Sequence, residues 1–204
     1  MSAGTPVRSL DASALVLDRQ EYAAVRPELR SQLIPLRASR RVRVGDQIAL
    51  EFEDATTLQY QVQEMLIVEG VTDPNEVAHE IEAYTRLLPT SDSLVATFFV
   101  ECDDIATAKD ELLRLTGVQH AVALQVGDLP TVPGIEVVGL DEDGPSVLTQ
   151  AVHFLRFSLD AASRAGFVDP TVPVRVVVDH PEYRATGRIE GDTRAALIGD
   201  LTLN

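Results

Sequence analysis

Apolar and charged side chains alternate on either side of residues 45–47, and this pattern constrains the fold more than any other. The apolar positions are Val42, Val44, Ile48, Leu50 and Phe52, and arginine or glutamate fills most of the positions between them. Alternation with a period of two is typical of a strand that buries one face. Gly45 and Asp46 separate the two runs, as in the tight turn of a hairpin. The pattern therefore predicts a β-hairpin.

Two registers of this hairpin are open. A two-residue turn would place Arg43 opposite Ile48, which mixes the apolar and charged faces. A three-residue loop at residues 45–47 keeps the apolar residues on one face and places Arg41 opposite Glu51. Because a slip of one residue moves every side chain to the other face, we predict the second register. It also sets opposite charges across the two strands.

The period changes directly after the hairpin. Leu58, Val62, Met65 and Leu66 fall at i, i+4, i+7 and i+8, which predicts a helix over residues 57–69. A strand is the alternative, since Leu58, Tyr60 and Val62 also alternate, but this pattern fits three positions and the helix fits four. Asp54 or Thr56 can cap the helix, the run from Thr56 to Gln59 fits a capping box, and Gly70 ends it.

The remaining elements follow from similar signals. A capping box at residues 18–21 begins a helix that we expect Pro27 to divide in two, because proline inside a helix removes a hydrogen bond. Further helices are predicted from Asp73, from Asp104, around residues 160–165 and from Asp192. Strands are predicted at residues 94–102, 121–126, 135–138, 152–159 and 172–179.

Strands and helices are thus mixed without strict βαβ alternation. This order favours an α+β fold, with a mixed, largely antiparallel sheet and helices packed on one face. We expect a flexible N-terminal arm at residues 1–17 and a single domain at residues 18–204. The loop near residues 139–148 is the only plausible linker, and we do not expect it to separate two domains.

Charge and cysteine content exclude several classes of function. The formal net charge of -15 repels phosphate backbones and anionic lipid, so neither nucleic acid nor membrane is an expected partner. The first residues do not resemble a signal peptide, no segment approaches a membrane span, and a lone cysteine fits a reducing compartment. We therefore expect a cytoplasmic protein. Cys102 ends a predicted buried strand, and an inert core thiol is favoured there over a nucleophile.

The common catalytic motifs are missing, so candidate chemistry rests on two polar stretches. The first is residues 52–65, which gathers three carboxylates, three glutamines and a tyrosine around a strand-to-helix turn. Gln61 and Glu64 stand three apart and can share a helix face. One interpretation is a solvated helix flank, and the other is a site lined by Glu53, Gln61 and Glu64.

The second stretch is a pair of histidines on predicted strands. His153 shares a face with Leu155 and Phe157, and His180 shares a face with Val176 and Val178, so both imidazoles are expected to point inward. The common interpretation is a buried histidine with one hydrogen-bonded neighbour. The alternative is that His153 and His180 form a metal or acid–base site with glutamates.

We also predict that these groups converge. Inward-facing imidazoles need partners, and Arg156 stands on an otherwise apolar strand where it needs an acid. The prediction is that Glu53, either Gln61 or Glu64, Arg156 and at least one of the two histidines converge around one partly buried cavity. A closed network would be structural, whereas an open coordination position or a pocket would indicate function.

The sequence resembles the uncharacterised bacterial family named domain of unknown function 3501, from about Glu21 to Leu201. The residues that carry the resemblance are Glu21-Tyr22, Arg26, Arg30, Arg40-Arg41-Val42, Gly45, Phe52-Glu53, Tyr60-Gln61-Val62-Gln63-Glu64-Met65, Ala96-Thr97-Phe98, His153-Phe154-Leu155-Arg156-Phe157, Asp179-His180-Pro181 and Tyr183. The resemblance implies a single-domain cytoplasmic protein encoded near rubrerythrin-like proteins and iron–sulfur oxidoreductases. It implies no reaction. Basic residues expected near Ala55 and Ile67 are absent here, which weighs against anion binding by that helix.

Two hypotheses of function follow. The first is an accessory or interaction protein linked to redox or peroxide metabolism, whose partner is a rubrerythrin-like protein or an iron–sulfur oxidoreductase, with a homo-oligomer left open. The second is a small-molecule or metal-binding enzyme that uses a cluster of histidine, glutamate and glutamine. Its candidate ligand-binding residues are Arg41, Glu53, Gln61, Glu64 and Arg156, and its candidate metal ligands are His153 and His180. No cofactor is predicted.

Overall fold

A computed structural model describes residues 10–102, 104–137 and 151–202. Eight antiparallel strands form one sheet in the order β1-β2-β3-β6-β5-β4-β7-β8. The strands are β1 Arg41–Val44, β2 Ile48–Phe52, β3 Ser93–Val100, β4 Val122–Val126, β5 Val132–Glu136, β6 Val152–Ser158, β7 Val174–His180 and β8 Tyr183–Arg188. The helices are α1 Arg19–Ala38, α2 Ala55–Glu69, α3 Pro74–Thr85, α4 Ile105–Arg114, α5 Ala161–Val168 and α6 Gly191–Thr202. The predicted α+β class is confirmed.

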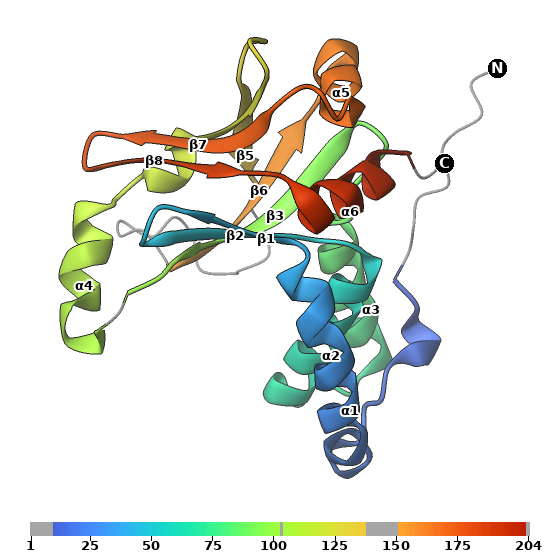
Figure 1. The fold of residues 1–204 in the computed structure, drawn as a ribbon. Coiled ribbons are helices and arrows are strands. Elements are labelled where there is room, and N and C mark those ends of the chain that lie inside the picture. Colours follow the sequence, from blue (N-terminus) through green and yellow to red (C-terminus); the bar gives the residue numbers. More distant parts are fainter. Residues whose placement is uncertain (1–9, 103, 138–150, 203–204) are drawn as a thin grey trace.

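The sheet curls until its two edge strands, β1 and β8, lie side by side (Figure 1). The hydroxyl of Tyr183 on β8 donates to the carbonyl of Val44 on β1 at 2.6 Å. Gly187 lies so close to β1 that a Cβ there would stand 2.3 Å from the carbonyl oxygen of Arg43. The result is a nearly closed barrel, which leaves little free edge for unwanted pairing.

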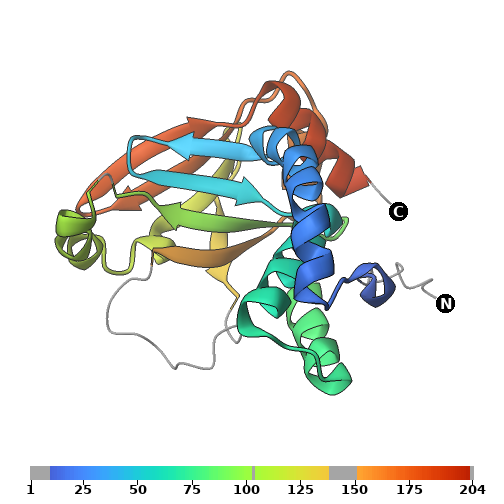
Figure 2. The ribbon, with the colours of Figure 1, turned by 90° about the horizontal axis from the view of Figure 1, so that it is seen from below.

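Helices contribute to two separate apolar clusters. Inside the barrel, α5 and α6 supply Phe167, Leu197 and Leu201 to the core that the inward-facing strand residues build. Outside it, α2 and α3 pack over Val95 of β3. The expected packing of helices on one face is therefore not confirmed. Figures 1 and 2 show α1, α2 and α3 grouped at one end of the barrel and α4 at the opposite end.

The hairpin and the first helix after it match the sequence analysis. The register pairs Arg41 with Glu51 and Val44 with Ile48, so the predicted register is confirmed. The helix predicted over residues 57–69 is α2. Its cap is Asp54, whose carboxylate accepts from the backbone N–H groups of Thr56 and Thr57, while the Thr57 hydroxyl accepts from the Asp54 N–H. The capping box is therefore Asp54 with Thr57, and the box predicted from Thr56 to Gln59 is wrong, because the helix begins at Ala55 and places Thr56 inside it.

The expected break at Pro27 is wrong, because α1 runs unbroken through Pro27 and Pro35. Pro27 removes one hydrogen bond, but Ala23, whose carbonyl it leaves without a helical donor, lies on the exposed side of the helix where water can bond it. The opposite side is anchored by the buried side chains of Tyr22 and Leu33. These buried contacts stabilise the helix on both sides of Pro27.

One strand was not predicted, and others are shifted. β8 follows Pro181-Glu182 and carries Arg184, Thr186 and Gly187, so it lacks the apolar alternation of the other strands. Its pairing with β7 and the contact with β1 stabilise it instead. β5 begins at Val132, three residues before the predicted strand. The loop proposed at residues 139–148 lies outside the described residues.

Residues 10–17 lie against α2. The side-chain amides of Gln59 and Gln63 each form a pair of hydrogen bonds, with the backbone of Asp11 and of Val16 respectively. The division into an arm at residues 1–17 and a domain at 18–204 stays a prediction. Cys102 is half-buried just beyond β3, and its inert role stays a prediction too. In the described part of the chain, each helix is too short or too polar to cross a bilayer.

Candidate functional site

Polar side chains of helix α1 contact Glu64, which lies on helix α2. The Tyr22 hydroxyl donates to Glu64 Oε1 at 2.6 Å, and Arg26 holds both carboxylate oxygens, at 2.8 and 2.7 Å. The two bonds from Arg26 form the bidentate geometry typical of strong guanidinium–carboxylate pairs. The pKa of Glu64 is lowered to about 2, chiefly by the bonds from Arg26, with hydrogen bonds from Tyr22 and Tyr60 acting in the same direction and burial in the opposite one. Glu64 is therefore a fixed negative charge.

A second carboxyl group, that of Glu53, is buried where β2 leads into α2. It accepts hydrogen bonds from the hydroxyl of Thr57 at 2.5 Å and from the hydroxyl of Thr97 on β3. Burial raises the pKa of Glu53, while its bonds to Thr57, Thr97 and Gln61 and the charge of Arg37 act in the opposite direction. Glu53 is thus a carboxyl group that holds its proton more tightly than an exposed glutamate.

A ladder of ion pairs continues across the outer face of the sheet. Arg41 lies 3.1 Å from Glu51 and 2.6 Å from Glu101. Arg37 reaches the other oxygen of Glu51 at 3.7 Å, and Arg43 reaches Glu101 at 3.1 Å. These pairs connect the end of α1 to the outward side chains of β1 and β2. Each of these three arginines is therefore paired with at least one carboxylate.

The ladder also includes an aromatic contact. The guanidinium of Arg41 stands 5.3 Å from the centre of the Phe99 ring on β3. Such cation–π contacts fix the plane of an arginine in addition to its ion pairs. Arg41 is consequently held on three sides.

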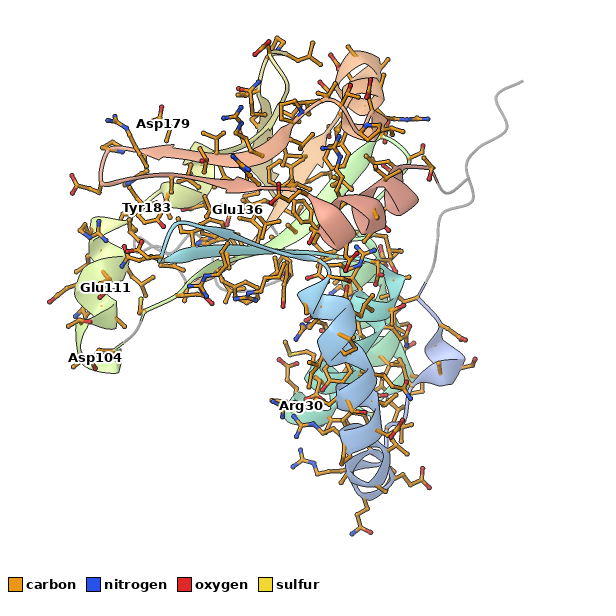
Figure 3. All side chains as sticks on the ribbon, in the orientation of Figure 1. Arg30, Asp104, Glu111, Glu136, Asp179 and Tyr183 are labelled. Carbon is orange, nitrogen blue, oxygen red and sulfur yellow. The ribbon has the colours of Figure 1, made fainter. Side chains whose placement is uncertain are left out.

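In most of these ion pairs the guanidinium is more exposed than the carboxylate. The exposed fraction of the side chain is 50% for Arg26 against 22% for Glu64, and 61% for Arg43 against 31% for Glu101. Arg30 is exposed, forms no ion pair with any described residue, and lies on the side of α1 that faces α4 (Figure 3). We name the set Arg26, Arg30, Arg37, Arg41 and Arg43 the arginine face.

Comparison with known proteins assigns the chain to a family. Residues 11–201 match the family described as protein of unknown function (DUF3501). The chain belongs to this family. It is also 35% identical to the chain in a crystal structure, at 1.90 Å resolution, of a novel protein of unknown function from Burkholderia pseudomallei K96243. That match has a TM-score of 0.82 and covers 95% of this chain and 100% of the other. No curated protein matches.

In this DUF3501 chain, four of the five predicted ligand-binding residues take part in the ion pairs and hydrogen bonds formed by α1, β1, β2 and α2. Glu64 pairs with Arg26 of the arginine face. Gln61 forms a hydrogen bond with Glu53, and the charge of Arg37 lowers the pKa of Glu53 against the effect of burial. Arg41 is a member of the face itself. Arg37, Thr97, Phe99 and Glu101 also contribute, although no local sequence pattern indicated them. The spacing of Tyr22, Arg26, Arg30 and Arg37 along one helix face would have indicated α1, had Pro27 not been interpreted as a break.

Arg156 lies elsewhere, and the expectation that it pairs with an acid is wrong. Its guanidinium donates to the hydroxyl of Ser93 at 2.7 Å and to the backbone carbonyls of Leu88 and Arg86. These carbonyls follow the end of α3, where a positive charge complements the helix dipole. Burial lowers the pKa of Arg156, and the charge of Asp92 opposes that shift. We therefore interpret Arg156 as part of the scaffold.

The predicted convergence on one cavity is wrong, because neither histidine nor Arg156 has Glu53, Gln61 or Glu64 among its hydrogen-bond partners in the described residues. His153 Nδ1 lies 2.6 Å from Glu136 Oε1, beside the ring of Phe98. His180 Nε2 lies 3.2 Å from the carbonyl of Thr116, and strands β4 and β5 separate its strand from that of His153. Within the described ranges, no three His, Cys, Asp or Glu side chains are grouped as metal ligands.

The contrast between the two carboxyl groups gives a testable pH dependence. Glu53→Gln is expected to flatten the fall in unfolding free energy that the native protein shows as pH rises above about 4.5. The folded pKa of Glu53 is raised, so the stability it contributes is complete below the unfolded pKa and is lost as pH rises through the folded value. Glutamine keeps the shape without a titrating proton.

Urea unfolding at about pH 3, about pH 4.5 and about pH 8 checks this prediction, because these values cover both sides of the ordinary glutamate pKa. Glu64→Gln is the matched control with the opposite sign. The pKa of Glu64 is lowered to about 2, so its contribution is present above the unfolded pKa and lost as pH falls. Equal pH profiles for Glu53→Gln and the native protein would contradict the raised pKa.

Proposed function

We propose that this protein is an accessory binding protein, and that its arginine face recognises an acidic surface on a partner protein. The observation that carries the proposal is the charge of residues 19–44. This segment holds seven arginines and two glutamates, a formal charge of +5 in a chain of -15. The rest of the chain therefore carries -20. Glu51, Glu64 and Glu101, which lie outside this segment, pair with the arginines of the face, so five guanidiniums against three carboxylates leave a local excess of two positive charges. A local positive excess in an acidic protein can select partners by charge.

The network beneath the face supports recognition rather than simple solubility. Glu51, Glu64 and Glu101 hold four of the five guanidiniums in place before a partner arrives. Preorganised side chains lose less entropy on binding, so more of the contact energy contributes to affinity. Arginine also binds carboxylates in a bidentate fashion, which lysine cannot do. The chain has a single lysine, Lys109, and none on this face.

The identity of the partner rests on the family resemblance alone. A rubrerythrin-like protein or an iron–sulfur oxidoreductase is the partner we propose, which would link this chain to redox or peroxide metabolism. An acidic surface on that partner would be attracted to the arginine face and repelled by the acidic remainder of the chain, which would orient the two proteins as they approach each other. A homo-oligomer stays a prediction without further support.

Removing two exposed arginines from the face is expected to weaken binding about tenfold or more at low salt. The variant is Arg30→Gln with Arg43→Gln, and the probes are poly-L-glutamate and a rubrerythrin-like protein from the same organism, measured by calorimetry. Arg164→Gln with Arg184→Gln is the control, because it makes the same change in net charge at exposed arginines outside the face. If both variants lose the same affinity, the loss is explained by the change in net charge alone, and the proposal is contradicted.

A second candidate uses the same region. We propose, as the alternative, that Arg41, Glu53, Gln61 and Glu64 bind a small polar ligand. The buried Glu53 favours this hypothesis, since ionisable groups with shifted pKa values gather at functional sites. The variants separate the two candidates: partner binding depends on Arg30 and Arg43 and survives Glu53→Gln, whereas small-ligand binding is lost with Glu53→Gln.

A further inference from the structure

A pocket of about 750 Å³ lies outside the arginine face, between the start of β7, the end of β8 and the first turns of α6. This volume falls within the range of roughly 300–1,000 Å³ that is usual for small-molecule sites. The polar residues that line it include Arg175, Thr186, Arg188 and the acidic Glu190, and Pro173, Ala195 and Ile198 are among its apolar residues. None of the residues of the arginine face lines it.

The two arginines of this pocket stand directly opposite each other. The register of β7 and β8 pairs Arg175 with Arg188, and both side chains point away from the barrel core, since their neighbours Val174 and Ile189 are buried. Like charges directly opposite on adjacent strands destabilise a sheet. Acidic residues outnumber basic ones by 32 to 17 in this chain, so the pairing is not what its composition favours.

The surroundings do little to offset this repulsion. Arg188 approaches Glu190 only at 3.9 Å, with both side chains largely exposed. Arg175 forms no ion pair within the described part of the chain. Arg194 also lines the pocket, but its guanidinium already donates hydrogen bonds to the backbone carbonyls of Phe167 and Asp169. It is therefore less available to a ligand than Arg175 and Arg188.

We propose that this pocket binds a small molecule with one oxyanion, a carboxylate or a phosphate, on an apolar body. The guanidiniums of Arg175 and Arg188 bind the oxyanion from two sides, which removes their mutual repulsion, and the Thr186 hydroxyl is within the same polar edge. The apolar body lies against Pro173, Ala195 and Ile198. The site is independent of the partner-binding role proposed above.

Titration of ¹⁵N-labelled protein with benzoate, phenyl phosphate and benzamide tests this proposal. Benzoate and phenyl phosphate distinguish the two oxyanions, and benzamide is the uncharged counterpart. The expected result is a saturable shift of the amide signals of Thr186 and Gly191 with at least one of the two anions and not with benzamide. No shift with either anion, or an equal shift with benzamide, would overturn the proposal.

Variants distinguish a binding role from a structural one. Arg188→Gln is expected to weaken the binding of the anion about tenfold or more, since one charge-assisted hydrogen-bonding partner is lost. Arg184→Gln is the matched control, because Arg184 lies on the same strand and face, pairs with Asp179 and is not part of the pocket. Equal weakening by the control would also overturn the proposal.

A thermal readout completes the test. Without ligand, Arg175→Gln is expected to raise the Tm by about 1–3 °C, because it relieves the repulsion across the strands. The same variant is expected to bind the anion more weakly. A fall in Tm would mean that Arg175 stabilises the sheet by itself, and would remove the argument for an anion.

Discussion

Replacing Arg40 with leucine is expected to lower the free energy of unfolding by about 3–5 kcal/mol. Arg40 is buried in the turn just before β1, and its guanidinium holds both carboxylate oxygens of Asp200 on α6, at 2.8 and 2.9 Å. It also lies 3.1 Å from Asp54, the cap of α2. Three elements far apart in the sequence therefore meet at one side chain.

The size of this effect comes from the carboxylate left behind. Asp200 is itself buried, so Arg40→Leu would leave a desolvated negative charge without its guanidinium. Burial lowers the pKa of Arg40, but its bond to Asp200 and the charges of Asp200 and Asp54 outweigh that effect, and the pKa is raised overall. The arginine is thus charged in the folded protein at any working pH.

Urea unfolding measures the change, with Arg43→Leu as the control. Arg43 is largely exposed and pairs with Glu101 at the surface, where an ion pair contributes at most about 1 kcal/mol. The double variant Arg40→Leu/Asp200→Leu is expected to recover part of the loss, because it removes both charges. A loss below about 1 kcal/mol for Arg40→Leu would show that the buried pair does not anchor the fold.

Gly187→Val is expected to destabilise the protein by about 2–3 kcal/mol. A Cβ at Gly187 would stand 2.3 Å from the Arg43 carbonyl oxygen and 2.8 Å from a methyl carbon of Val42. The nearest atom belongs to the backbone, so it cannot rotate away and β1 would have to separate from β8. This variant therefore tests the near closure of the barrel.

Gly199→Ala is the matched control for the glycine substitution. Gly199 lies in α6, and no atom stands within 4 Å of the Cβ it would gain. Alanine is the better helix former, so this variant is expected to stabilise by up to about 1 kcal/mol. If Gly187→Val unfolds at the same urea concentration as the native protein, β8 does not lie against β1 as described.

The sequence predicted the elements that depend on local pattern. The hairpin register followed from keeping one face apolar, and α2 followed from four positions at helical spacing with a cap before them. β8 could not be predicted in this way, because its residues alternate poorly and its partners β7 and β1 supply its stability. The course of α1 through Pro27 likewise depends on tertiary contacts of Tyr22 and Leu33.

The candidate site was predictable only in part. Arg41, Glu53, Gln61 and Glu64 come from one continuous stretch of hairpin and helix, so local spacing placed them together. Thr97 reaches Glu53 from a strand more than forty residues later. Arg156 and the histidines were expected to join through the need of buried polar groups for partners, but carbonyls of Leu88 and Thr116 and the carboxylate of Glu136 meet that need.

Protection of arginines from chemical modification tests the arginine face most directly. Phenylglyoxal modifies exposed guanidinium groups, and mass spectrometry gives the rate at each arginine with and without the rubrerythrin-like protein or poly-L-glutamate. The proposed function predicts that binding slows modification at Arg30, Arg37 and Arg43 and leaves Arg164 and Arg184 unchanged. Unchanged rates at all five, or protection confined to Arg164 and Arg184, would contradict it.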